Sequence, residues 1–192
     1  MATLLIRPSA PGDVCTIPKE VGAACPNHYL NVDDVIPDEA ATQVFDDCAP
    51  EDPLFDSYDL YALQNHTTES GVINFVKVYI RCYGEGPFRW AYTKIKTGGV
   101  EYEGGLNEPG AAWDTFSTQY NNKPGGGAWG SDWPLIDAIQ AGVKLEGLGD
   151  GKDGATVRCT QVYIEVDYTP APPGGGAVSG NIGHKMIGEG LI

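Results

Sequence analysis

The chain has 192 residues and a formal net charge of −14, from 12 Lys and Arg against 26 Asp and Glu. This acidity leaves no basic stripe to neutralise phosphates, which excludes nucleic acid and an anionic membrane surface as partners. The 26 glycines, the 14 prolines and a charged fraction of only 20% favour one turn-rich β domain over a helical protein.

The first third of the chain predicts little regular structure. TLLIRP at Thr3–Pro8 is a short strand, and SYDLYAL at Ser57–Leu63 is a second one. The part between them, residues 9–56, is broken by prolines and glycines, and no basic residue occurs between Lys19 and Lys77. We expect this acidic part to be irregular.

The middle of the chain holds the clearest strand pattern. In GVINFVKVYIRCYG, residues 71–84, apolar side chains from Val76 to Cys82 alternate with polar or aromatic ones, the period of a half-buried strand. FRWAYTKIKTGGVEYEG, residues 88–104, predicts a hairpin with glycines in its tight turn. AWDTFSTQY at Ala112–Tyr120 is the next strand, and a glycine-rich loop follows it.

One short helix is expected over residues 132–141, in SDWPLIDAIQAG. Ser131 caps it, Pro134 fits its first turn and Gly142 ends it. The run VKLEG, the turn GDGKDG and the alternating strand VRCTQVYIEVDY then close the domain near residue 168. Strands joined by tight turns predict an all-β fold, an antiparallel jelly-roll-like β-sandwich over residues 1–168. A parallel α/β fold would need a helix after most strands.

The last 24 residues carry no strand or helix period. Residues 169–177 read as a spacer of proline and glycine, which stops the last strand and lets the chain turn away. Residues 178–192 have few charges and no core of their own, so only another surface can offset the entropy of ordering them. We expect a C-terminal docking arm whose anchors are Val178, Ile182, Met186, Ile187, Leu191 and Ile192.

The five cysteines do not form a regular disulfide framework. The pair Cys15 and Cys25 is the favoured disulfide. Strand parity places Cys82 on the core face of its strand and Cys159 opposite the core face of its own, so a bridge between them needs a bulge or a non-core face. The remaining cysteines are read as buried thiols.

No catalytic signature is present in the sequence. The three histidines are scattered, and there is no nucleophile elbow, phosphate loop or dinucleotide fingerprint, so we expect neither an enzyme nor a cofactor. Cys25 and His28 have a spacing that suits zinc, with Cys15 and Cys48 as further candidates, although tighter pairs are usual. Calcium candidates are Asp46, Asp47, Asp52 and Asp56, but a solvated acidic face is the simpler interpretation.

Exposed aromatic side chains can stack on sugar rings, and the chain has several candidates. Trp129, within the glycine-rich loop, is the favoured one. Most large aromatic side chains belong to cores, so the others are weaker candidates: Trp90, Trp113, Trp133, Tyr79, Tyr83 and Tyr92.

The motifs VYIRCYG, IKTGGVEYEG, WPLIDAIQAGVKLEG and VRCTQVYIEVDY occur in that order. Together they resemble uncharacterised tailed-phage and prophage proteins, which have a jelly-roll-like sandwich and are regarded as virion structural or decoration proteins. The resemblance covers about residues 3–168 and rests on strand and turn patterns.

It implies a non-enzymatic capsid or tail decoration protein that binds copies of itself and a shell or tail protein of the same particle. The start MATLLIRPSAPGD lacks a secretion signal and no stretch could span a membrane, which fits assembly in a host cytoplasm and a place on the outer surface of the virion. The alternatives are an extracellular filament or surface-layer subunit joined by arm exchange, and a carbohydrate-binding adhesion module.

Overall fold

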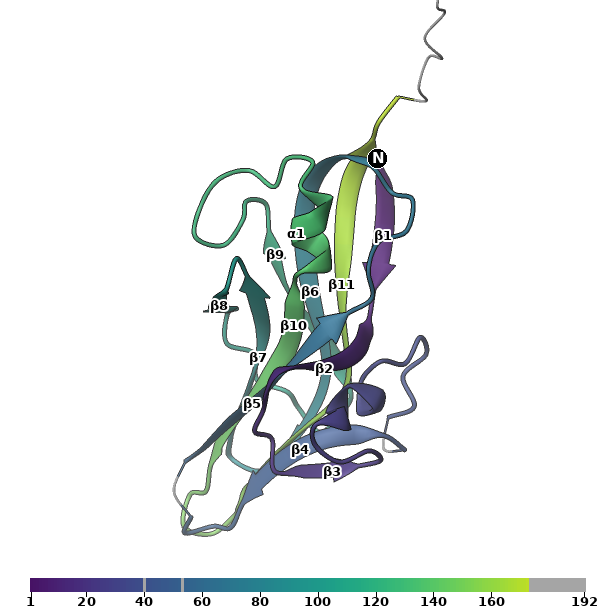
Figure 1. The fold of residues 1–192 in the computed structure, drawn as a ribbon. Helices are drawn as coiled ribbons and strands as arrows, with labels where there is room; N and C mark the ends of the chain where they lie inside the picture. The colour runs from purple at the N-terminus through teal and green to yellow at the C-terminus, as the bar shows by residue number, and fades with distance from the viewer. Residues whose placement is uncertain (40, 53, 173–192) are drawn as a thin grey trace, which may run out of the picture.

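Two antiparallel sheets pack face to face in the computed structural model, which describes residues 1–39, 41–52 and 54–172 (Figure 1). The first sheet contains β1 (Ala2–Ile6), β3 (Lys19–Val21), β4 (Gln43–Cys48), β6 (Gly71–Glu85), β9 (Asp114–Tyr120) and β11 (Ala155–Pro170). The second sheet contains β2 (Pro8–Cys15), β5 (Phe55–Leu63), β7 (Phe88–Thr97), β8 (Val100–Glu103) and β10 (Gln140–Leu148). The predicted all-β sandwich is confirmed.

The strand order is that of a jelly roll. The first sheet runs β4-β11-β6-β9 after the short β3, and the second runs β5-β10-β7-β8 after β2. Successive strands from β4 to β7 change sheet at every step, and so do β8 to β11. This arrangement of eight strands in two sheets is the double Greek key of a jelly roll, so the predicted topology is confirmed as well.

Two short strands share one edge of β11. β4 pairs with the first part of that strand, from Ala155 to Cys159, and β1 pairs with its later part, from Ile164 to Tyr168. The chain then crosses at Arg7 to the second sheet, where β2 pairs with β5. The N-terminal strands therefore tie both sheets together at their open edge.

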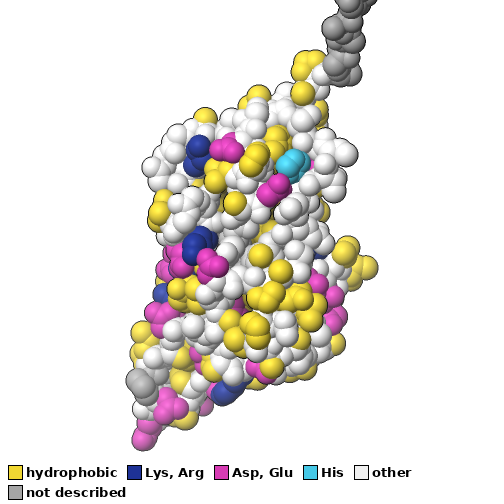
Figure 2. Space-filling model, viewed as in Figure 1, with side chains coloured by type: hydrophobic (Ala, Val, Ile, Leu, Met, Phe, Trp, Pro, Cys, Tyr) yellow, Lys and Arg dark blue, Asp and Glu magenta, His cyan; other side chains and the backbone are white. Residues whose placement is uncertain are grey.

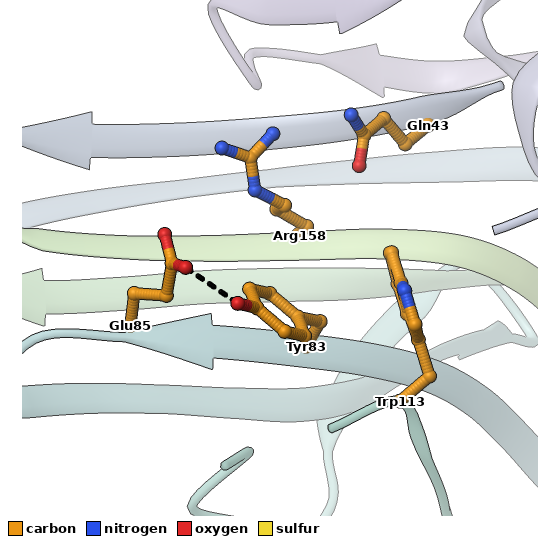
Figure 3. A pocket seen from close by; sticks show the side chains of 5 residues that line it. All are labelled: Gln43, Tyr83, Glu85, Trp113 and Arg158. Carbon is orange, nitrogen blue, oxygen red and sulfur yellow. Dashed lines mark hydrogen bonds between the residues drawn. The ribbon is translucent and has the colours of Figure 1, made fainter. Parts of the chain in front are cut away.

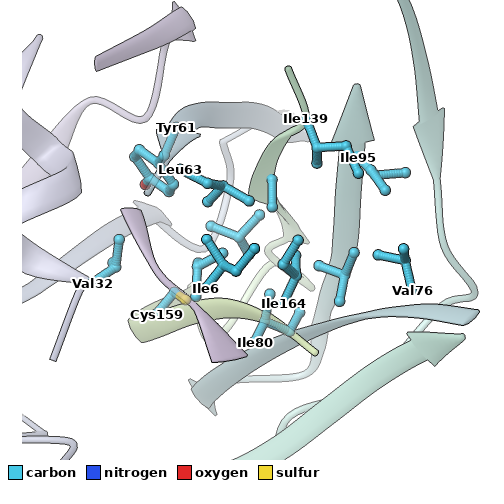
Figure 4. Packing of buried hydrophobic residues seen from close by; sticks show 14 of the residues in the cluster. Ile6, Val32, Tyr61, Leu63, Val76, Ile80, Ile95, Ile139, Cys159 and Ile164 are labelled. Atoms are coloured by element: carbon cyan, nitrogen blue, oxygen red, sulfur yellow. The ribbon is translucent and has the colours of Figure 1, made fainter. Parts of the chain in front are cut away.

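The core lies between the sheets and follows the alternation of the strands. On β6, Val76, Val78, Ile80 and Cys82 are buried while the residues between them face outward. They meet β11 side chains such as Ile164 and second-sheet side chains such as Ile95 (Figure 4). This apolar layer is the main stabilising feature of the sandwich, because each large aliphatic side chain contributes about 1.5–3 kcal/mol on burial.

The predicted tight turns are confirmed. The β7–β8 hairpin turns through Gly98 and Gly99, whose φ angles of 59° and 80° suit a two-residue turn that matches the twist of the strands. In GDGKDG, the carboxylate of Asp150 accepts the amide hydrogens of Lys152 and Asp153 at 2.9 Å each. That motif is thus a turn, and it carries the chain from β10 in the second sheet to β11 in the first rather than closing a hairpin.

Two predicted elements need correction. The helix α1 covers only Trp133–Asp137, and its cap is Asp132 rather than Ser131, because the Asp132 side chain accepts the amide of Leu135. Residues 140 and 141 belong to β10. The region 9–56 is less irregular than predicted: it holds most of β2, all of β3 and β4, and the 3₁₀ helix η1 (Asn27–Asn31).

β11 continues to Pro170, two residues beyond the predicted end of the domain. The arm residues Val178, Ile182, Met186, Ile187, Leu191 and Ile192 lie outside the described residues. Within the described ranges, no helix has the length and apolar character needed to cross a membrane.

Candidate functional site

A surface pocket of about 330 Å³ lies on the outer face of the first sheet. Three neighbouring strands and the residue before β9 supply its lining, which consists of Gln43, Tyr83, Glu85, Trp113 and Arg158. Figure 3 shows these side chains around one gap, with Arg158 and Gln43 on one side and Tyr83 on the other. The pocket is therefore assembled from residues far apart in the sequence.

Strand register explains why these side chains meet. Tyr83 on β6 lies opposite Arg158 on β11, and Phe45 on β4 lies on the other side of Arg158. Their chain neighbours Cys82 and Cys159 are buried in the core. Because successive side chains of a strand point to opposite faces, burial of the cysteines turns Tyr83 and Arg158 outward.

The aromatic wall of the pocket is made by Tyr83 and Trp113, both half-buried. Their ring centres are 5.5 Å apart and the ring planes are inclined by 39°. The Tyr83 hydroxyl donates a hydrogen bond to the Glu85 carboxylate, and this bond raises the pKa of Tyr83. The phenol therefore stays protonated and oriented at neutral pH.

The polar wall carries a guanidinium and an amide. Arg158 stacks on the Phe45 ring, with its guanidinium carbon 4.9 Å from the ring centre, which fixes the side chain beside the pocket. Gln43 is only 3% exposed, and its side-chain oxygen is buried without a hydrogen-bond partner. A buried acceptor without a partner is costly, and here it belongs to a residue that lines the cavity.

The pocket lining combines charged, polar and aromatic groups. Glu85 and Arg158 give the lining one negative and one positive charge, while Tyr83 and Trp113 offer apolar faces. A neutral ligand with an apolar face and several hydroxyls fits this combination.

A second cluster lies between η1 and β5 and consists of Cys15, His28 and Asp59. The Nδ1 atom of His28 is 2.7 Å from Oδ2 of Asp59 and 3.4 Å from Sγ of Cys15. Burial lowers the pKa of His28, but the hydrogen bond to Asp59 and the charges of Asp59 and Glu20 outweigh it and raise that pKa. A catalytic triad needs the nucleophile at one nitrogen of the histidine and the carboxylate at the other, whereas Cys15 and Asp59 both contact Nδ1 of His28.

The structure overturns the prediction that Trp129 stacks on sugars. Trp129 is 2% exposed, and its indole N–H donates to the main-chain oxygen of Tyr120 at 2.8 Å. The glycines before it let the loop fold back, so the ring enters the core. Trp133 is buried too, and its indole N–H donates to the main-chain oxygen of Gly71.

The calcium candidates are dispersed. Asp46 is buried and accepts a bond from Ser57, Asp47 pairs with Lys19, Asp52 accepts the Ala49 amide, and Asp56 lies 3.4 Å from Lys144. Asp46 and Asp47 are consecutive on β4 and so point to opposite faces. In the part of the chain that the structure describes, the only cluster of at least three potential metal ligands is Cys15, His28 and Asp59.

The cysteine predictions are borne out in part. Cys15 and Cys25 form a disulfide, with Cα atoms 6.1 Å apart. Cys82 and Cys159 are free, yet they lie directly opposite each other on β6 and β11 and are both buried. The predicted parity of Cys159 fails because the register shifts between Cys159 and Gln161. Cys48 is half-buried and free.

The outer face of the second sheet is also rich in aromatic side chains, but lysines cover them. Lys94 lies 4.6 Å from the ring centre of Tyr58, and Lys144 lies 5.0 Å from that of Tyr92. Glu103 lies near both lysines. On the face drawn in Figure 2, Lys and Arg side chains likewise lie beside Asp or Glu. These rings are therefore less open to a ligand than Tyr83 and Trp113.

No protein-family model matches the chain, and no curated protein matches it. Among solved structures, the chain is similar to a family 11 carbohydrate-binding module of the cellulosomal cellulase Lic26A-Cel5E of Clostridium thermocellum. The identity is 11% and the TM-score 0.26, over 75% of this chain and 95% of that chain.

Proposed function

We propose that this chain is a non-catalytic carbohydrate-binding β-sandwich that holds a sugar ring in the pocket on its first sheet. The observation that carries the proposal is the unpartnered side-chain oxygen of Gln43 beside the Tyr83 and Trp113 rings. A sugar supplies a partner for both features: its C–H face stacks on an aromatic ring, and its hydroxyls donate and accept hydrogen bonds.

The remaining side chains fit the same ligand. Arg158 donates hydrogen bonds, and Glu85 accepts them at the opposite side of the gap. The two opposite charges leave the lining neutral, which favours an uncharged saccharide over a phosphate or an ammonium ligand. A pocket of about 330 Å³ is at the small end for ligand sites, which suits one or two sugar units.

A glycan array followed by titration calorimetry tests the proposal. We expect a neutral saccharide to bind, and Trp113→Ala to weaken that binding by at least about fivefold, because a good aromatic contact contributes about 1 kcal/mol. The matched control is Trp90→Ala, which removes a half-buried tryptophan from the outer face of the second sheet. Equal affinity for the parent chain and Trp113→Ala would remove the pocket from consideration, and an array with no bound glycan would refute the function.

The role expected from the phage resemblance stays a prediction. Viral capsid proteins and lectins both use jelly rolls, so the fold is compatible with a decoration protein that carries a sugar-binding pocket. Removal of residues 173–192 should then abolish incorporation into particles while leaving saccharide affinity unchanged. Normal incorporation of the truncated chain would argue against the docking arm without affecting the pocket.

A further inference from the structure

Three side chains with metal-binding atoms converge between η1 and β5, and a fourth, Cys25, is bonded to one of them. Cys15 ends β2, Cys25 and His28 lie ten and thirteen residues later, and Asp59 lies in the middle of β5. Sγ of Cys15 is 3.4 Å from Nδ1 of His28, which is 2.7 Å from Oδ2 of Asp59. Cys25 is bonded to Cys15. Two sulfurs, an imidazole nitrogen and a carboxylate oxygen are the donors that zinc prefers.

The imidazole and the carboxylate are rigidly held. His28 is 1% exposed and Asp59 is fully buried. Oδ1 of Asp59 accepts the amide hydrogens of Thr16 at 2.8 Å and Ile17 at 3.1 Å, while the hydroxyl of Tyr61 donates to Oδ2. These bonds hold the Asp59 carboxylate in one orientation, with its Oδ2 atom directed at His28. Carboxylates that bind metals are usually fixed by bonds of this kind.

The far side of the imidazole has the environment of a ligating histidine. Its Nε2 atom is buried, makes no hydrogen bond and lies 3.5 Å from Oε2 of Glu20. A histidine that binds a metal through one nitrogen commonly presents the other N–H to a carboxylate. On the near side, Cys15 and Asp59 approach the same nitrogen, and one proton cannot bridge both, whereas a metal ion bonds to several donors at once.

We propose that reduction of the Cys15–Cys25 disulfide opens a tetrahedral zinc site formed by Cys15, Cys25, His28 and Asp59. Zinc bonds of about 2.0–2.3 Å place neighbouring ligand atoms about 3.3–3.8 Å apart in a tetrahedron. The 3.4 Å between Cys15 and His28 already lies in that range. The gap between His28 and Asp59 has to widen by about half an ångström, and the two sulfurs separate when their bond breaks.

The chemistry balances with a phosphine as reductant. The phosphine and one water molecule become a phosphine oxide, and the disulfide takes up the two electrons and two protons to give two thiols. Zinc then displaces both thiol protons and the proton on Nδ1 of His28. Oxidation of the sulfurs removes two of the four ligands, so the disulfide and the metal exclude each other.

Anaerobic titration of the full reduced chain with Co²⁺ tests this site. We expect one Co²⁺ per chain, with the visible bands of tetrahedral cobalt and a thiolate-to-cobalt charge-transfer band, and displacement of both by Zn²⁺. The chain with its disulfide intact should show none of these bands. Octahedral cobalt alone, or equal binding by the oxidised chain, would overturn the proposal.

Two variants and a control locate the metal. Cys25→Ser removes an exposed ligand and should lower Co²⁺ affinity at least tenfold and weaken the charge-transfer band. Glu20→Gln keeps all four ligands and should lower the affinity about tenfold, as outer partners of ligands do, which preserves the test if Cys25→Ser does not fold. Cys48→Ser removes a free thiol outside the cluster and should change nothing. Loss of the bands in Cys48→Ser, or their retention in both other variants, would contradict the assignment.

Discussion

Gly142 is the point where β5 and β10 approach too closely for any side chain. It pairs with Leu60, and a Cβ atom added to it would lie 1.8 Å from the main-chain oxygen of Asp59. That atom belongs to a neighbouring strand, so it cannot rotate away as a flexible side chain would. We therefore predict that Gly142→Ala is strongly destabilising although alanine is small and apolar.

The expected size follows from the geometry. An ordinary contact starts at 3.4 Å, so the 1.8 Å approach requires a displacement of about 1.6 Å. Such a shift forces the two backbones apart, which costs about 1–3 kcal/mol as other overpacking does, and it disrupts about two hydrogen bonds of the ladder, at about 0.5–1.5 kcal/mol each. The free energy of unfolding should fall by about 4 kcal/mol, which lowers Tm by about 10 °C in a domain of this size.

Thermal unfolding followed by circular dichroism measures this effect. The control is Gly105→Ala, because nothing lies within 4 Å of a Cβ built on Gly105. That change should be neutral or stabilise by up to about 1 kcal/mol, since alanine restricts the unfolded chain. A Tm for Gly142→Ala within about 2 °C of the parent would show that the strands separate freely at this point, and the reasoning about close approach would fail.

Three further predictions concern the buried cluster and the turns. His28 faces Asp59, Glu20 and Cys15, and its raised pKa means that its ion pair stabilises the fold fully below the unfolded pKa of 6.5 and that this stabilisation is lost as pH rises through the folded pKa; the urea midpoint should therefore fall as pH rises above 6.5, and a midpoint that rises there would contradict the ion pair. Reduction of the Cys15–Cys25 disulfide without metal should lower the free energy of unfolding by about 2–3 kcal/mol, as expected for a loop of this length. An unchanged urea midpoint after reduction would show that the bond does not restrict the unfolded chain. Asp150→Ala, compared with the exposed Lys152→Ala, should cost about 1 kcal/mol because two amides lose their acceptor; equal thermal stability of the two variants would refute that role.

The strand pattern in the sequence was informative wherever pairing is regular. The alternation from Val76 to Cys82 predicted both β6 and its buried face, because β6 itself stays regular there: it pairs with β9 without a register shift, and the bulge opposite Arg81 and Cys82 lies on β11. β2 escaped prediction because it contains Pro11 and Gly12 and its pairing with β5 shifts register twice. Prolines and glycines inside a strand weaken the local signal, and only pairing with β5 makes the segment extended.

The candidate pocket could not be predicted from the sequence. Tyr83 and Trp113 were recognised as aromatic candidates, but their proximity depends on which strands are neighbours. Gln43 and Arg158 gave no local signal, since each is only one of several polar residues on its strand. The inward position of Cys159 depends on a bulge that periodicity cannot reveal. The prediction that Trp129 is exposed was wrong because glycine-rich loops usually lie at the surface, while this loop turns back into the core.

The pairing of β1 with the end of β11 places both ends of the described chain at one pole of the sandwich (Figure 1). Arg158, in the pocket, precedes Pro170 by twelve residues of one strand, a span of about 40 Å at 3.3 Å per residue. Anchoring the domain through either end would therefore hold the pocket well away from the support. In that arrangement the sandwich would act as a spacer, and a ligand bound in the pocket would require no movement at the point of attachment.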